Sequence, residues 1–165
     1  MSSNSCPCGN TGREDESCLC SRREIQQYWK RLGGPLLDRI DIRLQTEPLP
    51  TGEILRQSRL SSSDMRLQIE VARKRQTYRF SACELRWNRD IPSSRMRDWC
   101  PMTKRAESTL VAAAGRATMS ARSHIAVMRL ARTIADIEDC ELIEDSHMNE
   151  AISLRRYGDG DLYWR

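Results

Sequence analysis

Four cysteines near the N-terminus constrain the fold of this chain more than any other feature. They lie at Cys6, Cys8, Cys18 and Cys20, in the pattern C-x-C-x9-C-x-C. The loop between the two pairs contains glycine and asparagine, so the pairs can fold back toward each other. Four thiolates that meet at one point match the tetrahedral geometry that Zn²⁺ prefers, and the sequence therefore predicts a structural zinc site. The alternative is four reduced thiols in a surface loop, since common structural zinc sites use the wider C-x2-C spacing.

The other cysteines and the overall charge limit the class of protein. The chain has 165 residues, seven cysteines and a formal net charge of +4. Its N-terminus lacks the basic and apolar regions of a signal peptide, so we expect a reduced, cytoplasmic protein without disulfides. Cys83, Cys100 and Cys140 are then expected to be small buried side chains. No apolar run is long enough to span a bilayer, and the mild positive charge alone does not demand a nucleic-acid partner.

Helical periodicity dominates the pattern of apolar residues. Aromatic residues make up only 5% of the chain, which argues against an all-β sandwich. Helices are predicted over residues 21–32, 64–80, 94–99, 103–116, 121–137 and 145–155, with Ser21, Ser94, Thr103 and Ser120 at their starts. Ile40, Ile42 and Leu44 alternate with charged residues and predict one short strand. The predicted fold class is mainly α.

A region rich in proline, glycine and serine divides the chain. We predict a first part over residues 1–50, a linker over 51–63 and a helical bundle over 64–165. The predicted 64–80 helix has an apolar face with Met65, Ile69, Ala72 and Gln76, and a second face that carries Arg66, Arg73, Lys74, Arg75 and Arg79. A basic helix face of this kind can bind a nucleic-acid backbone, although most such faces are only solvated.

Histidines and acidic residues provide no metal-binding pattern. His124 and His147 are isolated and are expected to be structural or exposed. The acidic run from Asp136 to Asp145 lacks the spacing of an EF-hand loop, so it is predicted to be a solvated turn.

Four ordered motifs resemble one protein family. They are Asn4-Ser-Cys-Pro-Cys-Gly9, Cys18-Leu-Cys20, Gly34-Pro-Leu-Leu-Asp-Arg-Ile-Asp41, and Ser120-Ala-Arg-Ser followed by Arg129-Leu-Ala-Arg-Thr-Ile-Ala-Asp136. Over about residues 4–155 the chain resembles the C-terminal part of magnesium-chelatase-like AAA+ ATPases of the ComM/YifB type. The resemblance implies a DNA-acting, ATP-driven hexameric ring of the kind linked to competence and branch migration. This chain would contribute the end of the α/β core, with a cysteine-rich insertion, and the helical lid.

The resemblance also implies roles for three polar residues. Asn4 falls at the sensor-1 asparagine, which orients the attacking water. Arg39 falls at the arginine finger, which reaches the ATP of a neighbouring subunit, and Arg122 falls at the sensor-2 arginine. Taken from the residues alone, Arg39 is equally an exposed ion-pair partner of the aspartates beside it, and Arg122 an ordinary solvated side chain.

Two features depart from the family pattern. Ser5 stands where the family usually has proline, and no G-x-x-x-x-G-K-[ST] or acidic Walker B strand occurs in the chain. Without a P-loop there is no cradle for phosphates and no hydroxyl for Mg²⁺. We therefore expect no ATP hydrolysis by this chain alone. ATP and Mg²⁺ would bind only together with an upstream half of the same protein, within a ring of subunits that acts on DNA.

Two other functions fit the same residues. The first is a stand-alone zinc-containing module that binds nucleic acid or a protein and has no catalytic activity. The second is an inactive remnant of a larger ATPase.

Overall fold

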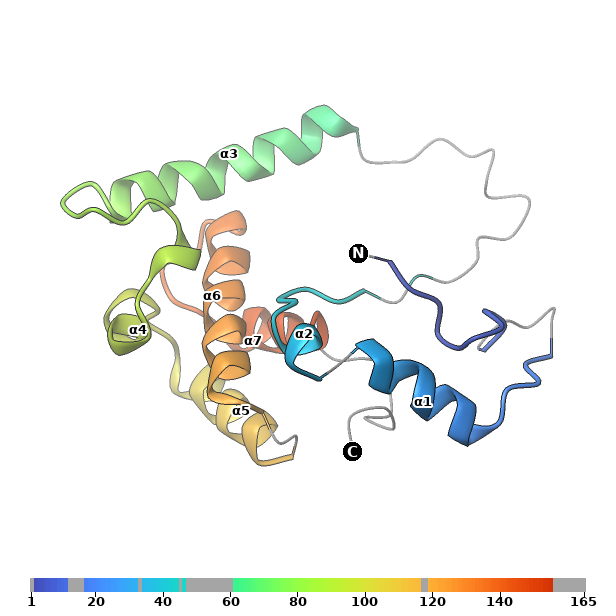
Figure 1. Cartoon of the computed structure of the whole chain (residues 1–165). Helices are drawn as coiled ribbons and strands as arrows, with labels where there is room; N and C mark the ends of the chain where they lie inside the picture. The colour runs from blue at the N-terminus through green and yellow to red at the C-terminus, as the bar shows by residue number, and fades with distance from the viewer. Residues whose placement is uncertain are drawn as a thin grey trace. The chain divides into compact units, whose positions relative to one another are not determined.

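The structure is a computed structural model that describes residues 2–11, 17–32, 34–44, 46, 61–116 and 119–155. These residues form two compact units, unit 1 within residues 2–46 and unit 2 within residues 61–155. Both units are helical, so the predicted mainly α class is confirmed (Figure 1). Most of the predicted linker and the tail after Arg155 lie outside the described residues. The described part contains no helix that is both long and apolar enough to cross a membrane.

Unit 1 contains helices α1 (Arg22–Leu32) and α2 (Gly34–Asp38). Ser21, the predicted start of α1, forms a capping box with Glu24. The Ser21 backbone N–H donates to Glu24 Oε2 at 2.8 Å, and the Glu24 N–H donates to Ser21 Oγ at 3.3 Å. Trp29 on α1 is buried, and its indole Nε1 donates to the Ser5 carbonyl at 3.0 Å. This bond attaches α1 to the segment that carries the first two cysteines.

The strand predicted over residues 40–44 does not form. The segment has no regular secondary structure, and Ile42 and Leu44 are 50% and 68% exposed. A strand requires a neighbouring strand that satisfies its backbone hydrogen bonds, and within the described residues this segment takes part in no β-bridge. The alternating pattern was therefore not enough to specify a strand.

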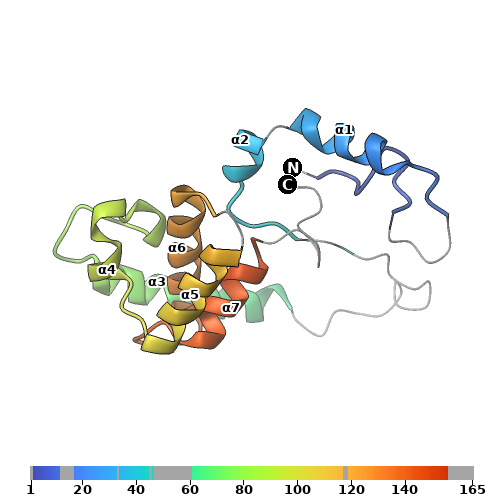
Figure 2. The same cartoon turned by 90° about the horizontal axis from the view of Figure 1, so that it is seen from below.

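Unit 2 is organised around helix α6 (Ala121–Ile137). It packs against α3 (Ser62–Arg79) and α7 (Asp145–Ser153), and α7 also packs against α5 (Lys104–Arg116) (Figures 1 and 2). Along α6 the apolar residues recur at helical spacing, with Val127, Ala131 and Ile134 buried and Leu130 partly buried against the core. A parallel bridge between Met102 and Ile143 joins the segments that lead into α5 and α7.

Helix starts follow the predicted side-chain caps, with two differences. Ser61, not a later residue, caps α3, and Asp64 completes the capping box, so α3 begins two residues earlier than predicted. Ser94 caps no helix, because it lies inside the 3-10 helix η2 (Ser93–Arg95), which continues into α4 (Met96–Trp99). A further 3-10 helix, η1 (Asn88–Asp90), lies between α3 and η2.

Helix α3 is buried over only part of its length. Ala72 and Gln76 are buried as predicted, but Met65 and Ile69, on the same predicted face, are 47% and 51% exposed. The reason is that all residues from 61 to 71 are exposed, so the first half of α3 extends past the helices that cover its second half.

Candidate functional site

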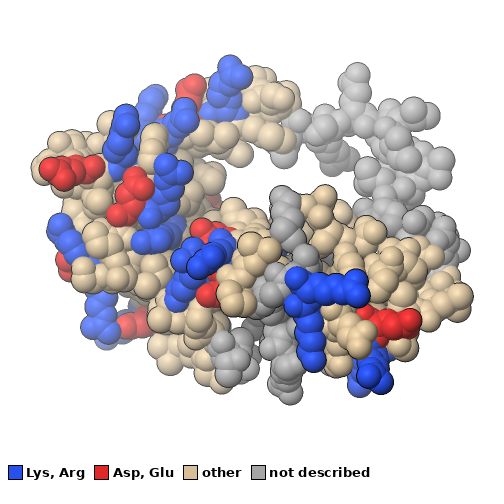
Figure 3. All heavy atoms as spheres, viewed as in Figure 1, with Lys and Arg blue, Asp and Glu red and all other residues tan. Residues whose placement is uncertain are grey.

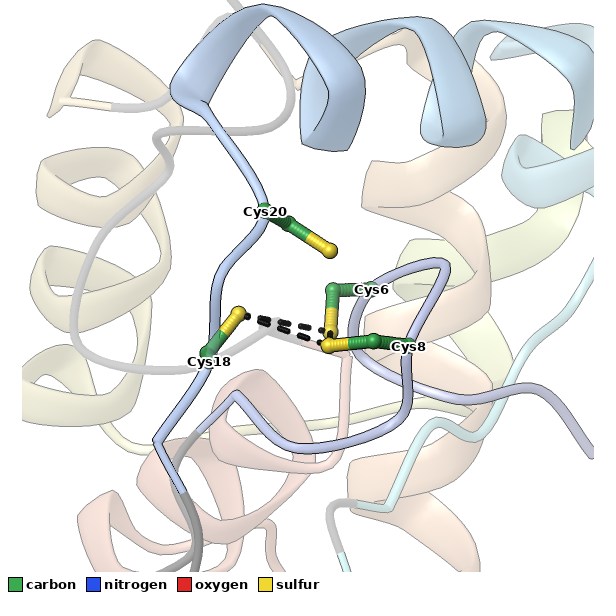
Figure 4. A group of neighbouring side chains, drawn as sticks. All are labelled: Cys6, Cys8, Cys18 and Cys20. Atoms are coloured by element: carbon green, nitrogen blue, oxygen red, sulfur yellow. Dashed lines mark hydrogen bonds between the residues drawn. The ribbon is translucent and has the colours of Figure 1, made fainter.

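The four N-terminal cysteines form one cluster in unit 1. Their side chains point toward one another, with Cys6 and Cys8 on one loop and Cys18 and Cys20 on the segment that leads into α1 (Figure 4). The Sγ atoms of Cys6 and Cys8 lie 3.3 Å apart, and each lies 3.7 Å from Sγ of Cys18. All four Sγ atoms are within 4.8 Å of one another. The structure thus brings together the two pairs that the sequence analysis grouped.

These spacings fit a tetrahedral zinc ion. A Zn–S bond of ~2.3 Å in a regular tetrahedron places neighbouring sulfurs about 3.8 Å apart. The two contacts to Cys18 match that value at 3.7 Å, the Cys6–Cys8 contact is shorter at 3.3 Å, and the Cys20 sulfur lies within 4.8 Å of the other three. All-sulfur donors with no open position are typical of a structural zinc site, which supports the chain and does no chemistry itself.

The local backbone explains how such short spacings are possible. Gly9 has a φ of +85°, and its N–H donates to the Cys6 carbonyl at 3.1 Å, which closes a tight turn around Cys8. On the other side of the cluster, Thr11 Oγ1 lies 3.0 Å from Sγ of Cys18. Cys20 directly precedes the N-terminal end of α1, whose partial positive charge stabilises thiolates.

The thiols of the cluster differ widely in pKa. Burial raises the pKa of Cys6, but hydrogen bonds from Thr11 and the neighbouring cysteines outweigh it and lower that pKa to about 5. A hydrogen bond with the Cys8 backbone lowers the pKa of Cys20, whereas its contacts with the other cluster side chains and its burial raise it to about 12. Thiolates this close repel one another, so they cannot all ionise without a cation. A divalent ion removes the repulsion and displaces the remaining protons.

The three residues given roles by the family resemblance all have exposed side chains. In unit 1, Asn4 lies beside the glycine turn, where its Nδ2 is 3.4 Å from the position that a Cβ of Gly9 would take. Arg39 follows the last residue of α2, and its backbone N–H donates to the Leu36 carbonyl at 3.1 Å. In unit 2, Arg122 lies in the first turn of α6, after the Ser120 cap.

A buried polar network in unit 2 was missed by the sequence analysis. Asp136, assigned there to a solvated turn, is fully buried at the end of α6. It accepts hydrogen bonds from both Nη atoms of Arg79 on α3, from Asn88 Nδ2 at 2.8 Å, and from Arg132 Nε at 3.1 Å. Arg132 also donates to the carbonyls of Glu141 and Cys140 at 2.6 Å each. The Arg-x-x-x-Asp spacing on one helix was the available signal.

This network changes the interpretation of the basic face of α3. Arg79 is committed to Asp136, and Arg75 pairs with Asp139. The cations of that face with exposed side chains are therefore Arg66, Arg73 and Lys74. The exposed basic face of α3 therefore has three cations, fewer than the five that the sequence indicated.

A second group of potential ligands contains Glu138, Cys140 and His147, whose ligand atoms also lie within 4.8 Å of one another. His147 is buried, and its Nδ1 accepts a hydrogen bond from the Glu144 N–H at 2.9 Å. The neutral ring must then carry its proton on Nε2, which lies 3.0 Å from Glu138 Oε2. Both ring nitrogens are thus engaged in hydrogen bonds, and His147 holds the start of α7. This agrees with the structural role predicted for it.

Protein-family comparisons match nearly the whole chain. The family described as "Magnesium chelatase, subunit ChlI C-terminal" matches residues 59–155, and "Magnesium chelatase, subunit ChlI" matches residues 1–54. The two matches together cover the cysteine cluster, the 34–41 motif and the whole of α6.

Curated relatives include YifB of Escherichia coli K12, which is 31% identical over 139 residues, 82% of this chain and 26% of YifB. An uncharacterized protein of Mycobacterium tuberculosis H37Rv is 27% identical over 158 residues, 96% of this chain and 31% of the relative. The competence protein ComM of Haemophilus influenzae is 26% identical over 135 residues, 82% of this chain and 26% of ComM. The chain therefore spans about a quarter to a third of the length of these relatives. It belongs to the magnesium chelatase subunit ChlI family, together with YifB and ComM.

Proposed function

We propose that this chain supplies the C-terminal share of an ATP-driven AAA+ ring that acts on DNA. The observation that carries the proposal is the match of residues 59–155 to the family's C-terminal region, with Arg122 exposed in the first turn of α6. Arg39 supports it from unit 1, since its exposed guanidinium makes no ion pair among the described residues. A finger that acts on another subunit must be free of internal partners.

Each residue has a distinct task in this proposal. Asn4 orients the attacking water, and Arg39 neutralises the charge that develops on the γ-phosphoryl group of a neighbouring subunit. Arg122 binds phosphate in its own subunit, at the helix end where backbone N–H groups also favour an anion. The zinc ion holds unit 1 together. ATP and Mg²⁺ require a P-loop, which this chain lacks, so the active unit includes an upstream half and neighbouring subunits.

A chimaeric protein tests the proposal. In it, this chain replaces the region of E. coli YifB that it matches, so that the rest of YifB provides the upstream sequence. We expect the chimaera to hydrolyse ATP and Arg39→Ala to reduce turnover about 10³-fold, because an arginine finger contributes 10³–10⁵ in kcat. Nucleotide affinity should change little in that variant, whereas Arg122→Ala should weaken it.

The matched control is Arg97→Ala, which removes another exposed arginine, this one from α4. Its turnover should equal that of the unmodified chimaera. A chimaera that binds ATP and hydrolyses it at the same rate with and without Arg39 would contradict the finger role.

A zinc-containing, nucleic-acid-binding module without catalysis is the second candidate. It is favoured by the exposed side chains of Arg66, Arg73 and Lys74 on α3, a helix along which Lys and Arg side chains lie at the surface (Figure 3). Binding to a DNA duplex should then weaken with salt, with a slope of about −0.9 per phosphate contacted. Replacing Arg66 and Lys74 by alanine should flatten that slope, whereas Arg89→Ala, which removes an 82% exposed arginine outside α3, should not.

A further inference from the structure

The described part of unit 1 has a very small apolar core. Among its described residues, the buried apolar side chains are Cys6, Trp29 and Leu37. Unit 2, by contrast, has a continuous cluster of sixteen buried residues. A unit with so little apolar surface to bury lacks the driving force to fold by the hydrophobic effect alone.

The cysteine cluster is connected to the few buried residues of unit 1. Cys6 is both a metal ligand of the proposed site and one of the three buried apolar residues. The Trp29 indole donates to the carbonyl of Ser5, the residue directly before Cys6. Cys20 lies directly before the Ser21 cap of α1. Helix α1 is therefore attached to the cluster at its N-terminal end, through the chain, and at Trp29, through a hydrogen bond.

We infer that unit 1 folds only when a metal ion occupies the cysteine cluster, while unit 2 stays folded with or without the ion. The inference rests on the proposed zinc site. Metal removal would break the bonds that join the two cysteine pairs and release α1 with Trp29. Asn4 would lose its position beside the Gly9 turn. The bound metal ion thus determines whether Asn4, the proposed sensor-1 residue, is held in position. The position of Asn4 would therefore respond to metal binding.

Two-dimensional ¹H–¹⁵N NMR of the full chain tests this directly. The chain contains four tryptophans, and each gives one indole N–H signal. Trp29→Phe assigns the signal of unit 1, and Trp99, partly buried against the core of unit 2, provides the internal reference. On addition of a chelator, we expect the signals of the Trp29 indole and the α1 amides to shift to the values of an unfolded chain, while the Trp99 indole signal stays unchanged. One equivalent of Zn²⁺ should restore them.

Matched variants distinguish zinc-dependent folding of unit 1 from zinc binding alone. Cys18→Ser should abolish the zinc-dependent signals, whereas Cys83→Ser, outside the cluster, should preserve them. Zinc that binds with one-to-one stoichiometry but leaves the Trp29 and α1 signals unchanged would overturn the inference and leave the zinc site intact. A chain that binds no zinc would overturn both.

Discussion

Asp136 and Arg132 form an ion pair on α6 in which both side chains are fully buried, with 3.1 Å between Arg132 Nη2 and Asp136 Oδ1. Burial lowers the pKa of the Arg132 guanidinium, and the Asp136 carboxylate opposes that effect. Arg79 joins the same carboxylate from α3, so the pair connects two helices and the turn after α6. Asp136 therefore belongs to the structural core of unit 2. The family motif that ends at this residue, Arg129–Asp136, thus contains residues that stabilise the fold.

Replacement of Asp136 by alanine should destabilise unit 2 strongly. The substitution leaves two guanidinium groups without their carboxylate in the interior, and removal of one partner from a buried pair costs about 3–5 kcal/mol. Chemical unfolding of the full chain, followed by circular dichroism, measures the change. Asp139→Asn is the control, since that carboxylate is 71% exposed, its pair with Arg75 should contribute ~0–1 kcal/mol, and asparagine tolerates the left-handed backbone (φ +58°) at this position. Equal effects of the two substitutions would contradict the account of the network.

The capping box of α3 should weaken in acid. Hydrogen bonds from the Ser61 side chain and then its backbone lower the pKa of Asp64 below its ordinary value. A lowered pKa means that the cap stabilises α3 fully above about pH 4, the unfolded pKa, and less as the pH falls through the folded pKa. NMR titration of the Asp64 carboxyl in Ser61→Ala should give a higher pKa than in the unmodified chain. An unchanged value would show that the bond does not form in solution.

Thiol reactivity should sort the seven cysteines into three groups. Burial raises the pKa of Cys100 to about 11, so at pH 8 only about one thiol in a thousand is ionised there. With zinc bound, we expect iodoacetamide to modify the half-buried Cys83 and Cys140 first. Chelation should expose the four cluster thiols and leave Cys100 protected until unit 2 unfolds. Peptide mass spectrometry after timed labelling measures each site, and early modification of Cys100 would contradict its burial.

Two glycines should respond oppositely to alanine. Gly9 has a positive φ, and the left-handed conformation costs a residue with a Cβ about 1–2 kcal/mol, so Gly9→Ala should weaken zinc binding about tenfold. Gly115 lies in α5 with open space around it, so Gly115→Ala should stabilise unit 2 by about 0.5–1 kcal/mol and leave zinc binding unchanged. A competition titration against a zinc-binding dye measures the affinity. Equal zinc affinity in Gly9→Ala and the unmodified chain would contradict the role of the turn.

Much of the helical structure was predictable because its signals are local. Ser21 with Glu24 and Ser120 at the start of α6 act through hydrogen bonds to residues three positions away, so the sequence alone contains both partners. The buried stripe of α6 follows from helical periodicity in the same way. The cysteine cluster was predictable because its two pairs are close in sequence and share one chemistry.

The errors concern residues whose environment depends on distant parts of the chain. The predicted strand at 40–44 forms no β-bridge within the described part of the chain, and the buried Asp136 carboxylate is paired with Arg79, 57 positions earlier. The exposure of Met65 likewise depends on where the covering helices end. A single sequence shows the periodicity of each segment but not which distant residues will contact it in the fold.

Zinc content of the purified full chain is the measurement that tests the central structural claim most directly. Inductively coupled plasma mass spectrometry should give one zinc per chain for the unmodified protein and for Cys83→Ser. Cys8→Ser and Cys18→Ser should each lose most of that zinc, because three thiolates cannot complete the closed tetrahedral site. One zinc per chain in Cys18→Ser, or no zinc in the unmodified chain with all seven thiols reduced, would contradict the claim that the cluster is a metal centre.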